Sequence, residues 1–513
     1  MINCAHFVNA GLEGEPVGGR SISRRKFLAA TSAVAGSSML HPPFIFGELT
    51  LSLAQSDTPA DYSLTIATKP IELAPKRIVS MTTYNGRFPG PLLRFKEGRQ
   101  VTVDVHNETD TPEQLHWHGQ AVPSNLDGAA EEETPFIPPR GSRRISFVPK
   151  PSGFRFYHTH VRAGSDLSRG QYSGLVGPVY IEPKQDPGSY DREVFLTLKE
   201  FDPTFSQGGD MDMDFLSPAA TVKTLKDTGE EAMKASLAKG MPRGYEVGYG
   251  AFTINGRMLG HGEPVRVKQG ERVLFHILNG SAGEIRSLAL PGHTFSIIAM
   301  DGNPLPKPMR VPGLWLGTAE RISAIVDMNH PGVWIMGDVG DDDRSHGMGI
   351  VVEYAGHRGK PLWIGPKPFR WNYALLGHFQ PPTSAPHEIF DVTFAKDNAA
   401  IEGFNRWTIN GVSYPSDQMA ATPMFHLKEG NRYRLRMRNA SDDIHPVHLH
   451  RHAFELTTIA GQRTSGVMKD VVMIGGYQEA EVDFTADNPG LTLFHCHQQL
   501  HMDYGFMFLF DYV

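Results

Sequence analysis

The stretch Tyr84-Asn85-Gly86-Arg87 decides the fold, because it recurs as Ile254-Asn255-Gly256-Arg257 and as Ile409-Asn410-Gly411-Val412. A Lys-x-Gly signature follows each copy, at 96–98, 268–270 and 428–430, and an alternating apolar run such as 101–105 comes next. Each repeat closes with a turn that feeds another strand, at 151–158, 331–338 and 489–496. Self-similarity of this kind identifies structural units that are repeated along the chain.

The repeats predict the domain organisation. Short strands separated by Gly, Pro and Asn turns, with few helical periods, are typical of β-sandwiches. We expect three such domains, at residues 55–185, 190–357 and 365–513. The length of 513 residues agrees, because one compact core rarely organises so long a chain. Residues 206–244 interrupt the middle repeat and contain a helix-like stretch at 225–237, so we expect an inserted surface helix there.

Composition and charge exclude several kinds of partner. Hydrophobic residues make up 40% of the chain and charged residues 20%, as in a globular protein. No apolar run approaches the roughly 20 residues of a membrane-spanning helix. The net charge of −7, without a basic stripe, gives no attraction for nucleic acid or anionic lipid. We therefore expect a protein with no membrane span and no nucleic-acid partner.

Residues 1–54 resemble an export signal. The stretch SRRKFL at 23–28 precedes a small-residue apolar segment at 29–40, which is the twin-arginine pattern. Small residues at 52–54 suit a signal peptidase, so cleavage is expected after Ala54. Because twin-arginine machinery exports folded proteins, this route suits a chain that acquires a metal before crossing the membrane. We expect a periplasmic or extracellular location.

Histidines gather in four motifs. These are His116-Trp117-His118, His158-Thr159-His160, His445-Pro446-Val447-His448-Leu449-His450, and His495-Cys496-His497 with His501 beyond. Residues two apart on a strand share a face, so each His-x-His pair aims two imidazoles at one point. A single pair is often a surface accident, but four pairs at matching repeat positions predict metal binding. The middle repeat has lost these motifs and keeps only His293 at the corresponding place.

Cys496 is predicted to be a metal ligand. Of the two cysteines, Cys4 falls in the export signal, and a single thiol between histidines suggests a metal rather than a disulfide. On a strand Cys496 points away from its two neighbours, so it faces a different metal. A thiolate with two imidazoles is the ligand set of a blue copper centre, and His445 and His501 are the candidates to complete it. Zinc fits poorly, because structural zinc sites generally use two or more thiolates.

The four motifs, in this order, resemble the copper-binding segments of the three-domain multicopper oxidases, the group of laccases and copper-efflux oxidases. The resemblance covers nearly all of residues 55–513. It implies an all-β fold of three consecutive cupredoxin-like Greek-key β-sandwich domains, and four copper ions: one type 1, one type 2 and two type 3. The implied ligands are His445, Cys496 and His501 for type 1, His116 and His448 for type 2, and His118, His158, His160, His450, His495 and His497 for type 3.

The resemblance also implies the reaction. Single electrons leave the substrate at the type 1 centre, where Cys496 and His501 are the expected catalytic residues, and reach the trinuclear cluster, where dioxygen becomes water. Asp127 lies where relatives place an acid near that cluster, and it is predicted to deliver protons, although an Asp-Gly pair is by itself typical of a turn. Several bacterial relatives have a second acid where this chain has Met502, followed by Asp503.

One position bears on the copper potential. Relatives often have methionine five residues after the last type 1 histidine, and here that residue is Phe506, with Met507 one step further. A phenyl ring cannot coordinate, so Phe506 as the axial neighbour should favour Cu(I) and raise the potential. A one-residue bulge would instead place Met507 there. Phe506 is the predicted axial residue.

The copper ligands do not select the reductant. We expect a laccase-like oxidase of phenols or aromatic amines, with a periplasmic metallo-oxidase of Cu(I) as the alternative. Cuprous oxidases often carry a methionine-rich insertion, whereas this insertion has only Met211, Met213, Met233 and Met241. The acidic stretch at 210–214 could bind a metal ion, which is a secondary hypothesis. The alternative is a surface loop without a function. A third reading, a non-catalytic envelope scaffold, leaves the ten motif histidines and Cys496 unexplained.

Overall fold

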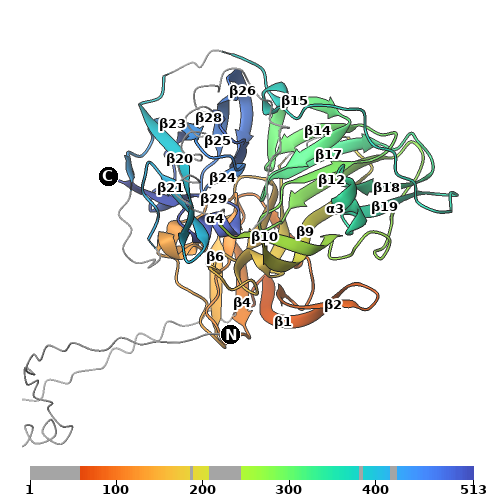
Figure 1. Cartoon of the computed structure of the whole chain (residues 1–513), viewed down its shortest axis with the longest axis horizontal. Helices are drawn as coiled ribbons and strands as arrows, with labels where there is room; N and C mark the ends of the chain where they lie inside the picture. Colours follow the sequence, from red (N-terminus) through yellow and green to blue (C-terminus); the bar gives the residue numbers. More distant parts are fainter. Residues whose placement is uncertain (1–57, 185–188, 207–243, 381–384, 416–423) are drawn as a thin grey trace, which may run out of the picture. The chain divides into compact units, whose positions relative to one another are not determined.

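The computed structural model describes residues 58–184, 189–206, 244–380, 385–415 and 424–513, and Figure 1 shows strands along all of them. The predicted export signal, the helix expected at 225–237 and the acidic stretch at 210–214 lie outside the described residues. Within the described ranges, no helix is long and apolar enough to cross a membrane.

The first domain consists of two four-stranded sheets, ordered β2-β1-β4-β6 and β3-β8-β7-β5. Its strands are β1 (Tyr62–Ala74), β2 (Arg77–Tyr84), β3 (Leu93–Lys96), β4 (Val101–Asn107), β5 (His116–His118), β6 (Ser142–Phe147), β7 (Gly153–His158) and β8 (Val176–Glu182). Helices α1 (Ser124–Asp127) and η1 (Ala130–Glu132) lie between β5 and β6, and η2 (Gly170–Tyr172) follows β7. One buried cluster joins side chains of both sheets, such as Val103 and Trp117, so the sheets pack face to face.

The second domain has a six-stranded sheet, β10-β9-β12-β17-β14-β15, and a five-stranded sheet, β11-β19-β18-β13-β16. The strands are β9 (Arg192–Ser206), β10 (Glu246–Ile254), β11 (Val265–Val267), β12 (Arg272–Asn279), β13 (Arg286–Ala289), β14 (Phe295–Met300), β15 (Asn303–Val311), β16 (Gly313–Leu316), β17 (Arg321–Asp327), β18 (Val333–Gly337) and β19 (Gly349–Tyr354). A short helix α3 (Asp341–Ser345) precedes β19, and η5 (Tyr373–Leu376) lies in the connection to the third domain.

The third domain repeats the strand order of the second, with sheets β21-β20-β23-β28-β25-β26 and β22-β30-β29-β24-β27. The strands are β20 (Glu388–Ile401), β21 (Phe404–Ile409), β22 (Phe425–Leu427), β23 (Arg432–Asn439), β24 (His445–Leu449), β25 (Phe454–Ile459), β26 (Gln462–Lys469), β27 (Val471–Ile474), β28 (Glu479–Thr485), β29 (Thr492–Cys496) and β30 (Met507–Tyr512). Helix α4 (Gln499–Asp503) connects β29 to β30. The all-β prediction and the threefold repeat are confirmed, while the exact domain boundaries stay predictions.

The recurring Asn-Gly pairs have one structural task in all three domains. Asn85, Asn255 and Asn410 adopt φ values of 54°, 53° and 51°, the left-handed conformation that asparagine tolerates in tight turns. Each asparagine side chain accepts a hydrogen bond from the neighbouring strand, from the amides of Thr65, Thr197 and Thr393 at 2.6, 2.8 and 2.8 Å. The sequence repeat therefore marks the tight turn that follows the opening hairpin of each domain.

The first domain departs from the repeat at one place that matters for the site. Between β5 and β6 the described chain forms α1 and η1, where the other domains have a hairpin, β14–β15 or β25–β26. This replacement brings Asp127, Glu131 and Glu132 into the interior, where all three are buried.

Candidate metal centre

Three of the predicted type 1 ligands converge in the third domain. His445 begins β24, Cys496 ends the paired strand β29, and His501 lies on α4. The Sγ of Cys496 lies 3.7 Å from His445 Nδ1 and 3.5 Å from His501 Nδ1, and the two Nδ1 atoms are 3.1 Å apart. All three residues are buried. Their donor atoms form a compact thiolate–imidazole group with space for one ion at its centre.

Neighbouring residues on β29 serve a second group. His495 points away from Cys496 and its Nε2 lies 3.4 Å from His160 Nε2 and 3.0 Å from His450 Nε2. The alternation of side chains along a strand explains this division. A single strand therefore joins the thiolate group to a histidine cluster by one peptide bond.

The histidine cluster forms where the first and third domains meet. His116 of β5 pairs with His158 of β7, and His448 of β24 pairs with His495 of β29. Rings from the two domains then stack on one another: His118 on His448 with centroids 3.7 Å apart, and His116 on His450 at 4.1 Å. Sets of donor atoms within 4.8 Å of one another include His116–His118–His158, His116–His448–His450 and His160–His450–His495. The ring of His497 lies 5.0 Å from those of His118 and His158.

Hydrogen bonds fix the orientation of the rings. In four histidines, Nδ1 lies 2.7–2.9 Å from a backbone carbonyl oxygen. These are His116, His158, His448 and His495. The contact holds the proton on Nδ1 and leaves the lone pair of Nε2 available to a metal ion. His118 is held the other way round, because its Nε2 lies 3.1 Å from Asp470 Oδ1. Metal-binding imidazoles are generally oriented by such partners.

The freed nitrogen atoms fit a bound cation. Among the described residues, the following buried atoms have no hydrogen-bond partner: Nε2 of His116, His158, His448 and His497, and Nδ1 of His118, His160 and His497. A buried polar atom without a partner is costly unless an ion or water satisfies it. Burial lowers the pKa of His116 to about 4 and the pKa values of His445 and His495 to about 3. The imidazoles are therefore neutral at pH 7, the form that binds metal.

The thiol of Cys496 leads to the same conclusion. Burial raises the pKa of the Cys496 thiol far above its usual range, so without a cation the sulfur keeps its proton. A bound metal ion reverses this preference, because a coordinating thiol is deprotonated. The thiolate–imidazole group thus fits a soft transition metal such as copper.

Acidic side chains surround the histidine cluster. Asp127 Oδ2 lies 2.9 Å from His116 Nδ1 and 2.8 Å from His450 Nδ1. Burial raises the pKa of Asp127 to about 7. Sequence reasoning found Asp127 but missed Glu131, with Oε2 3.8 Å from His160 Nδ1, and Glu132, with Oε1 3.5 Å from His450 Nδ1. The available signal was the run of glutamates at 131–133 that follows Asp127. It did not point to the site, because acidic residues are seldom buried.

Phe506, and not Met507, lies beside the thiolate–imidazole group. The Phe506 ring centroid is 4.6 Å from that of His445, and its carbonyl accepts a hydrogen bond from Cys496 N at 3.1 Å. Met507 pairs with His495 in the ladder and packs in a separate cluster with Leu493 and Met502. The ladder between β29 and β30 runs in continuous register from Thr492 to His495, so no bulge exchanges the two residues.

Asp503 does not face the cluster as a free acid. Its carboxylate accepts hydrogen bonds from the amides of Ala163 and Gly164 at 3.0 and 2.8 Å and from Gln499 Nε2 at 2.8 Å. These contacts anchor α4 to the first domain. Met502 is buried in the apolar cluster that also holds Met507. The position directly after His501 is therefore apolar here, and Asp503 is engaged in structural hydrogen bonds.

The middle domain has no ligand at the place equivalent to β24. His293 is tied to Pro291 O by Nδ1 at 2.7 Å and to the Tyr354 hydroxyl by Nε2 at 2.5 Å. Both ring nitrogens are thus occupied by structural contacts. The middle domain nevertheless reaches the cluster indirectly, through Arg321 and Asp470.

Three β-sandwich domains that hold a thiolate–imidazole group beside an interdomain histidine cluster define a copper-binding oxidoreductase of the cupredoxin class. Family models described as "Multicopper oxidase" match residues 65–186, 221–352 and 382–513. The chain belongs to the multicopper oxidase family.

Individual relatives agree with this assignment. The chain is 28% identical to Multicopper oxidase MmcO of Mycobacterium tuberculosis, over 96% of this chain and 97% of the relative. It is 28% identical to Copper resistance protein A of Pseudomonas syringae pv. tomato, over 60% of this chain and 52% of that protein, and 28% identical to Laccase-1 of Fomitopsis schrenkii, over 82% and 81%. A solved multi-copper oxidase from Pseudomonas thermotolerans has a TM-score of 0.66 at 23% identity, covering 89% of this chain and all of that one.

Proposed function

We propose that this protein is a laccase-like oxidase, which couples one-electron oxidation of phenols or aromatic amines to four-electron reduction of dioxygen to water. Four bound copper ions would supply the electron transfer and the oxygen chemistry. His445, Cys496 and His501 would hold the type 1 ion, with Phe506 as a non-coordinating axial neighbour. His116 and His448 would hold the type 2 ion, and the type 3 pair would use His118, His158, His160, His450, His495 and His497.

The observation that carries the choice of reductant is a row of aromatic side chains beside His501. Trp407 stacks on the His501 ring with centroids 4.1 Å apart, and its amide donates to Tyr504 O. Tyr504 stacks on Phe404 at 4.5 Å, and Phe404 contacts Tyr245. Tyr504 and Tyr245 are partly exposed, so the row leads from the ligand to the surface. Partly exposed aromatic rings offer stacking partners to an aromatic reductant.

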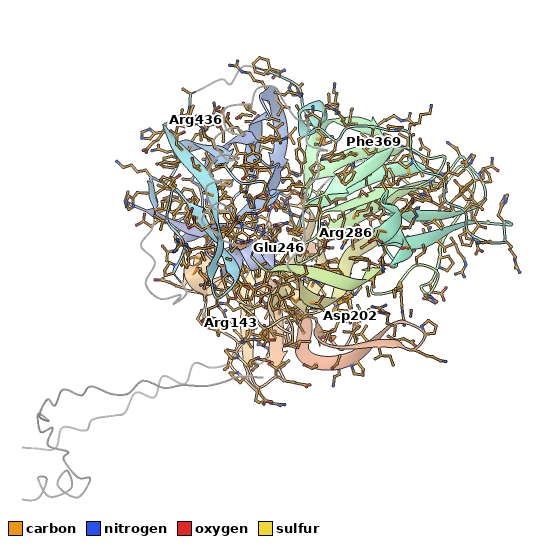
Figure 2. All side chains as sticks on the ribbon, viewed as in Figure 1. Arg143, Asp202, Glu246, Arg286, Phe369 and Arg436 are labelled. Atoms are coloured by element: carbon orange, nitrogen blue, oxygen red, sulfur yellow. The ribbon has the colours of Figure 1, made fainter. Side chains whose placement is uncertain are left out.

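Charges near the same ligand disfavour a metal cation as reductant. Lys396 Nζ lies 2.8 Å from Asp442 Oδ1 and 2.9 Å from Asp443 Oδ1, so an internal cation already pairs both carboxylates. Glu246, labelled in Figure 2, approaches from the middle domain, where its Oε1 accepts a hydrogen bond from Asn405 Nδ2. Burial, together with nearby Asp443, raises the pKa of Glu246 to about 8. With Glu246 protonated, Lys396, Asp442 and Asp443 together carry a net charge of only −1, a weak attraction for Cu(I).

The chain's own groups also serve the oxygen half of the reaction. The Asp127 carboxyl contacts two ligand rings and hydrogen-bonds Glu132, and together they hold a proton beside the cluster. We assign Asp127 to proton delivery. The twin-arginine segment at 23–28 supports export of the folded, loaded protein to the periplasm or beyond, with the twin-arginine machinery as a transient partner.

Oxidation of Cu(I) is the second candidate, favoured by the similarity to Copper resistance protein A. The deciding experiment reduces the copper-loaded protein without oxygen, readmits air, and compares steady-state rates for a methoxyphenol and for chelated Cu(I). Faster phenol turnover with oxygen uptake supports the laccase assignment. Faster Cu(I) turnover, with phenols active only when copper is added, identifies a metallo-oxidase.

A variant pair connects that result to the aromatic row. Tyr504→Ala should raise KM for the methoxyphenol several-fold and leave the rate with Cu(I) unchanged, whereas Tyr504→Phe, which keeps the ring, should behave like the wild type. Equal loss with both reductants in Tyr504→Ala would contradict a role of the row in substrate binding.

A further inference from the structure

The described part of the middle domain contributes no side chain to the histidine cluster or to the thiolate–imidazole group. Six charged side chains from all three domains nevertheless meet in the interior next to the histidine cluster. They are Arg155 of the first domain, Asp301, Glu320 and Arg321 of the second, and Lys469 and Asp470 of the third. Every one of them is buried. Three positive and three negative groups balance one another, but buried ion pairs often contribute little net stability. Because the burial of six charges is costly, we expect this cluster to have a role besides stability.

Arg321 is the most fully bonded member of this junction. Its Nη1 and Nη2 donate to Asp470 Oδ1 and Oδ2 at 2.7 and 2.6 Å, the two-pronged arrangement that matches a guanidinium to a carboxylate. The other donors reach the carbonyls of Ala319, Asp301 and Phe154 at 2.9, 3.1 and 3.5 Å. All five N–H groups of the guanidinium are therefore used, which fixes its plane and with it the plane of the Asp470 carboxylate.

Asp470 in turn holds one ligand from each copper-binding domain. Its Oδ1 lies 3.1 Å from His118 Nε2 of the first domain, which leaves His118 Nδ1 free for a metal. Its backbone carbonyl lies 2.7 Å from His448 Nδ1 of the third domain, which leaves His448 Nε2 free. The position of a single residue thus sets two ligand rings.

Asp301 is a second residue of the middle domain that holds Asp470 in place. One carboxylate oxygen accepts from Arg321 N at 3.0 Å, and the other accepts from the amides of Asp470 and Val471 at 3.3 and 3.2 Å. Lys469 Nζ adds ion pairs to Asp301 and Glu320 at 2.9 and 2.8 Å. Backbone and side chain of Asp470 are both held from the middle domain.

The first domain is shaped for this close approach. Gly119, directly after the His116–His118 strand, has φ +76°, and a Cβ there would lie 2.6 Å from both Arg321 Nη2 and Asp470 Oδ2. Any larger residue would displace the Arg321–Asp470 pair.

We propose that Arg321 is a positioning residue of the trinuclear cluster, through which the ligand-free middle domain orients Asp470 and hence His118 and His448. The proposal rests on the proposed copper assignment of these two histidines. It predicts that losing the guanidinium weakens copper binding at the cluster and spares the thiolate–imidazole centre, which has no contact with this junction in the structure described here.

The test is a chelator titration of copper-loaded wild type, Arg321→Gln, Arg321→Lys and a control, Arg286→Gln. Arg286, labelled in Figure 2, is an equally buried arginine of the middle domain, and it pairs with Asp343 at 3.0 Å instead of Asp470. Copper per chain, the type 2 paramagnetic signal and the blue thiolate band are followed together, and thermal unfolding of the copper-free proteins reports on the fold.

We expect Arg321→Gln to lose cluster copper at about 10- to 100-fold lower chelator concentration than the wild type, with the blue band retained. Arg321→Lys, which keeps the charge but not the two-pronged contact, should be intermediate, and Arg286→Gln should match the wild type in cluster copper. Wild-type affinity in Arg321→Gln, or equal cluster loss in Arg286→Gln, would overturn the proposal.

If Arg321→Gln does not fold, Arg321→Lys decides: weakened cluster binding supports the positioning role, and wild-type binding refutes it. Failure of the copper assignment itself gives a different result, because the wild type would then show neither a blue band nor cluster copper.

Discussion

At the scale of single residues, Cys496 connects the thiolate–imidazole group to the histidine cluster. Its sulfur faces His445 and His501, while the adjacent His495 faces His160 and His450. The backbone between these neighbours is the shortest covalent path from one group to the other. The chemistry of the thiol and the alternation of the strand both follow from local sequence.

Replacing the sulfur tests the type 1 assignment. Cys496→Ser should abolish the intense blue thiolate band and the oxidase activity, because a hydroxyl does not form the copper–thiolate bond. The fold should persist, since serine fills nearly the same volume, and the thermal midpoint of the copper-free variant should stay close to that of the wild type. Absorption spectra and melting curves check both points, and a variant that stays blue would refute the assignment.

Asp127 can be tested separately from electron entry. Asp127→Asn keeps the size of the side chain but removes the exchangeable acid, so reoxidation of the reduced enzyme by oxygen should slow by about 100-fold. Anaerobic reduction by substrate should keep its rate. Stopped-flow measurements of the two half-reactions separate these effects. Asp110→Asn, at an exposed acid of the same domain, is the control, and unchanged reoxidation in Asp127→Asn would count against a proton role.

At the scale of elements, the register of β30 against β29 decides which side chain lies beside the thiolate–imidazole group. His495 pairs with Met507, so Phe506 falls on the side of Cys496 and His445. A shift by one residue would exchange the two side chains, because the side-chain period of a strand is two. The continuous ladder excludes this shift.

Phe506→Met is therefore expected to lower the reduction potential of the blue centre, because a thioether in axial position stabilises Cu(II). Met507→Leu should leave the potential unchanged, since Met507 packs with Leu493 and Met502 in another cluster. Redox titration of the blue band measures both variants. The reverse outcome, a change only in Met507→Leu, would show that the axial residue had been misassigned.

At the scale of the whole molecule, a partly buried acid in the middle domain makes stability depend on pH. Glu284 lies between β12 and β13, and burial raises its pKa from 4.5 to about 7. A raised carboxyl pKa means that the folded state binds the proton more tightly than the unfolded state, so the contribution of Glu284 to stability falls as pH rises from about 4.5 through about 7.

Glu284→Gln removes this titration. The variant should be more stable than the wild type by about 3 kcal/mol at pH 8 and nearly equal to it near pH 4.5, where the folded wild-type carboxyl is protonated. Thermal unfolding of the copper-free proteins at both pH values makes the comparison. An advantage that is the same at both pH values would contradict the titration of Glu284 as its cause.

The sequence by itself determined the repeat, the all-β class and the histidine motifs, because these depend on local properties: Asn-Gly turns, alternation along strands and the identity of donor atoms. It also indicated that Cys496 and its neighbours face opposite sides. Each of these inferences needs only a few consecutive residues, so no knowledge of long-range packing was required.

Only the tertiary structure decided how the domains cooperate. Burial of Glu131 and Glu132 follows from the replacement of a hairpin by α1 and η1, and the junction of Arg155, Arg321 and Asp470 joins residues up to 315 positions apart. Such contacts arise because separate sandwiches pack against one another, and a charge that this packing removes from water needs a partner. Local sequence patterns contain no record of which distant charge supplies the partner.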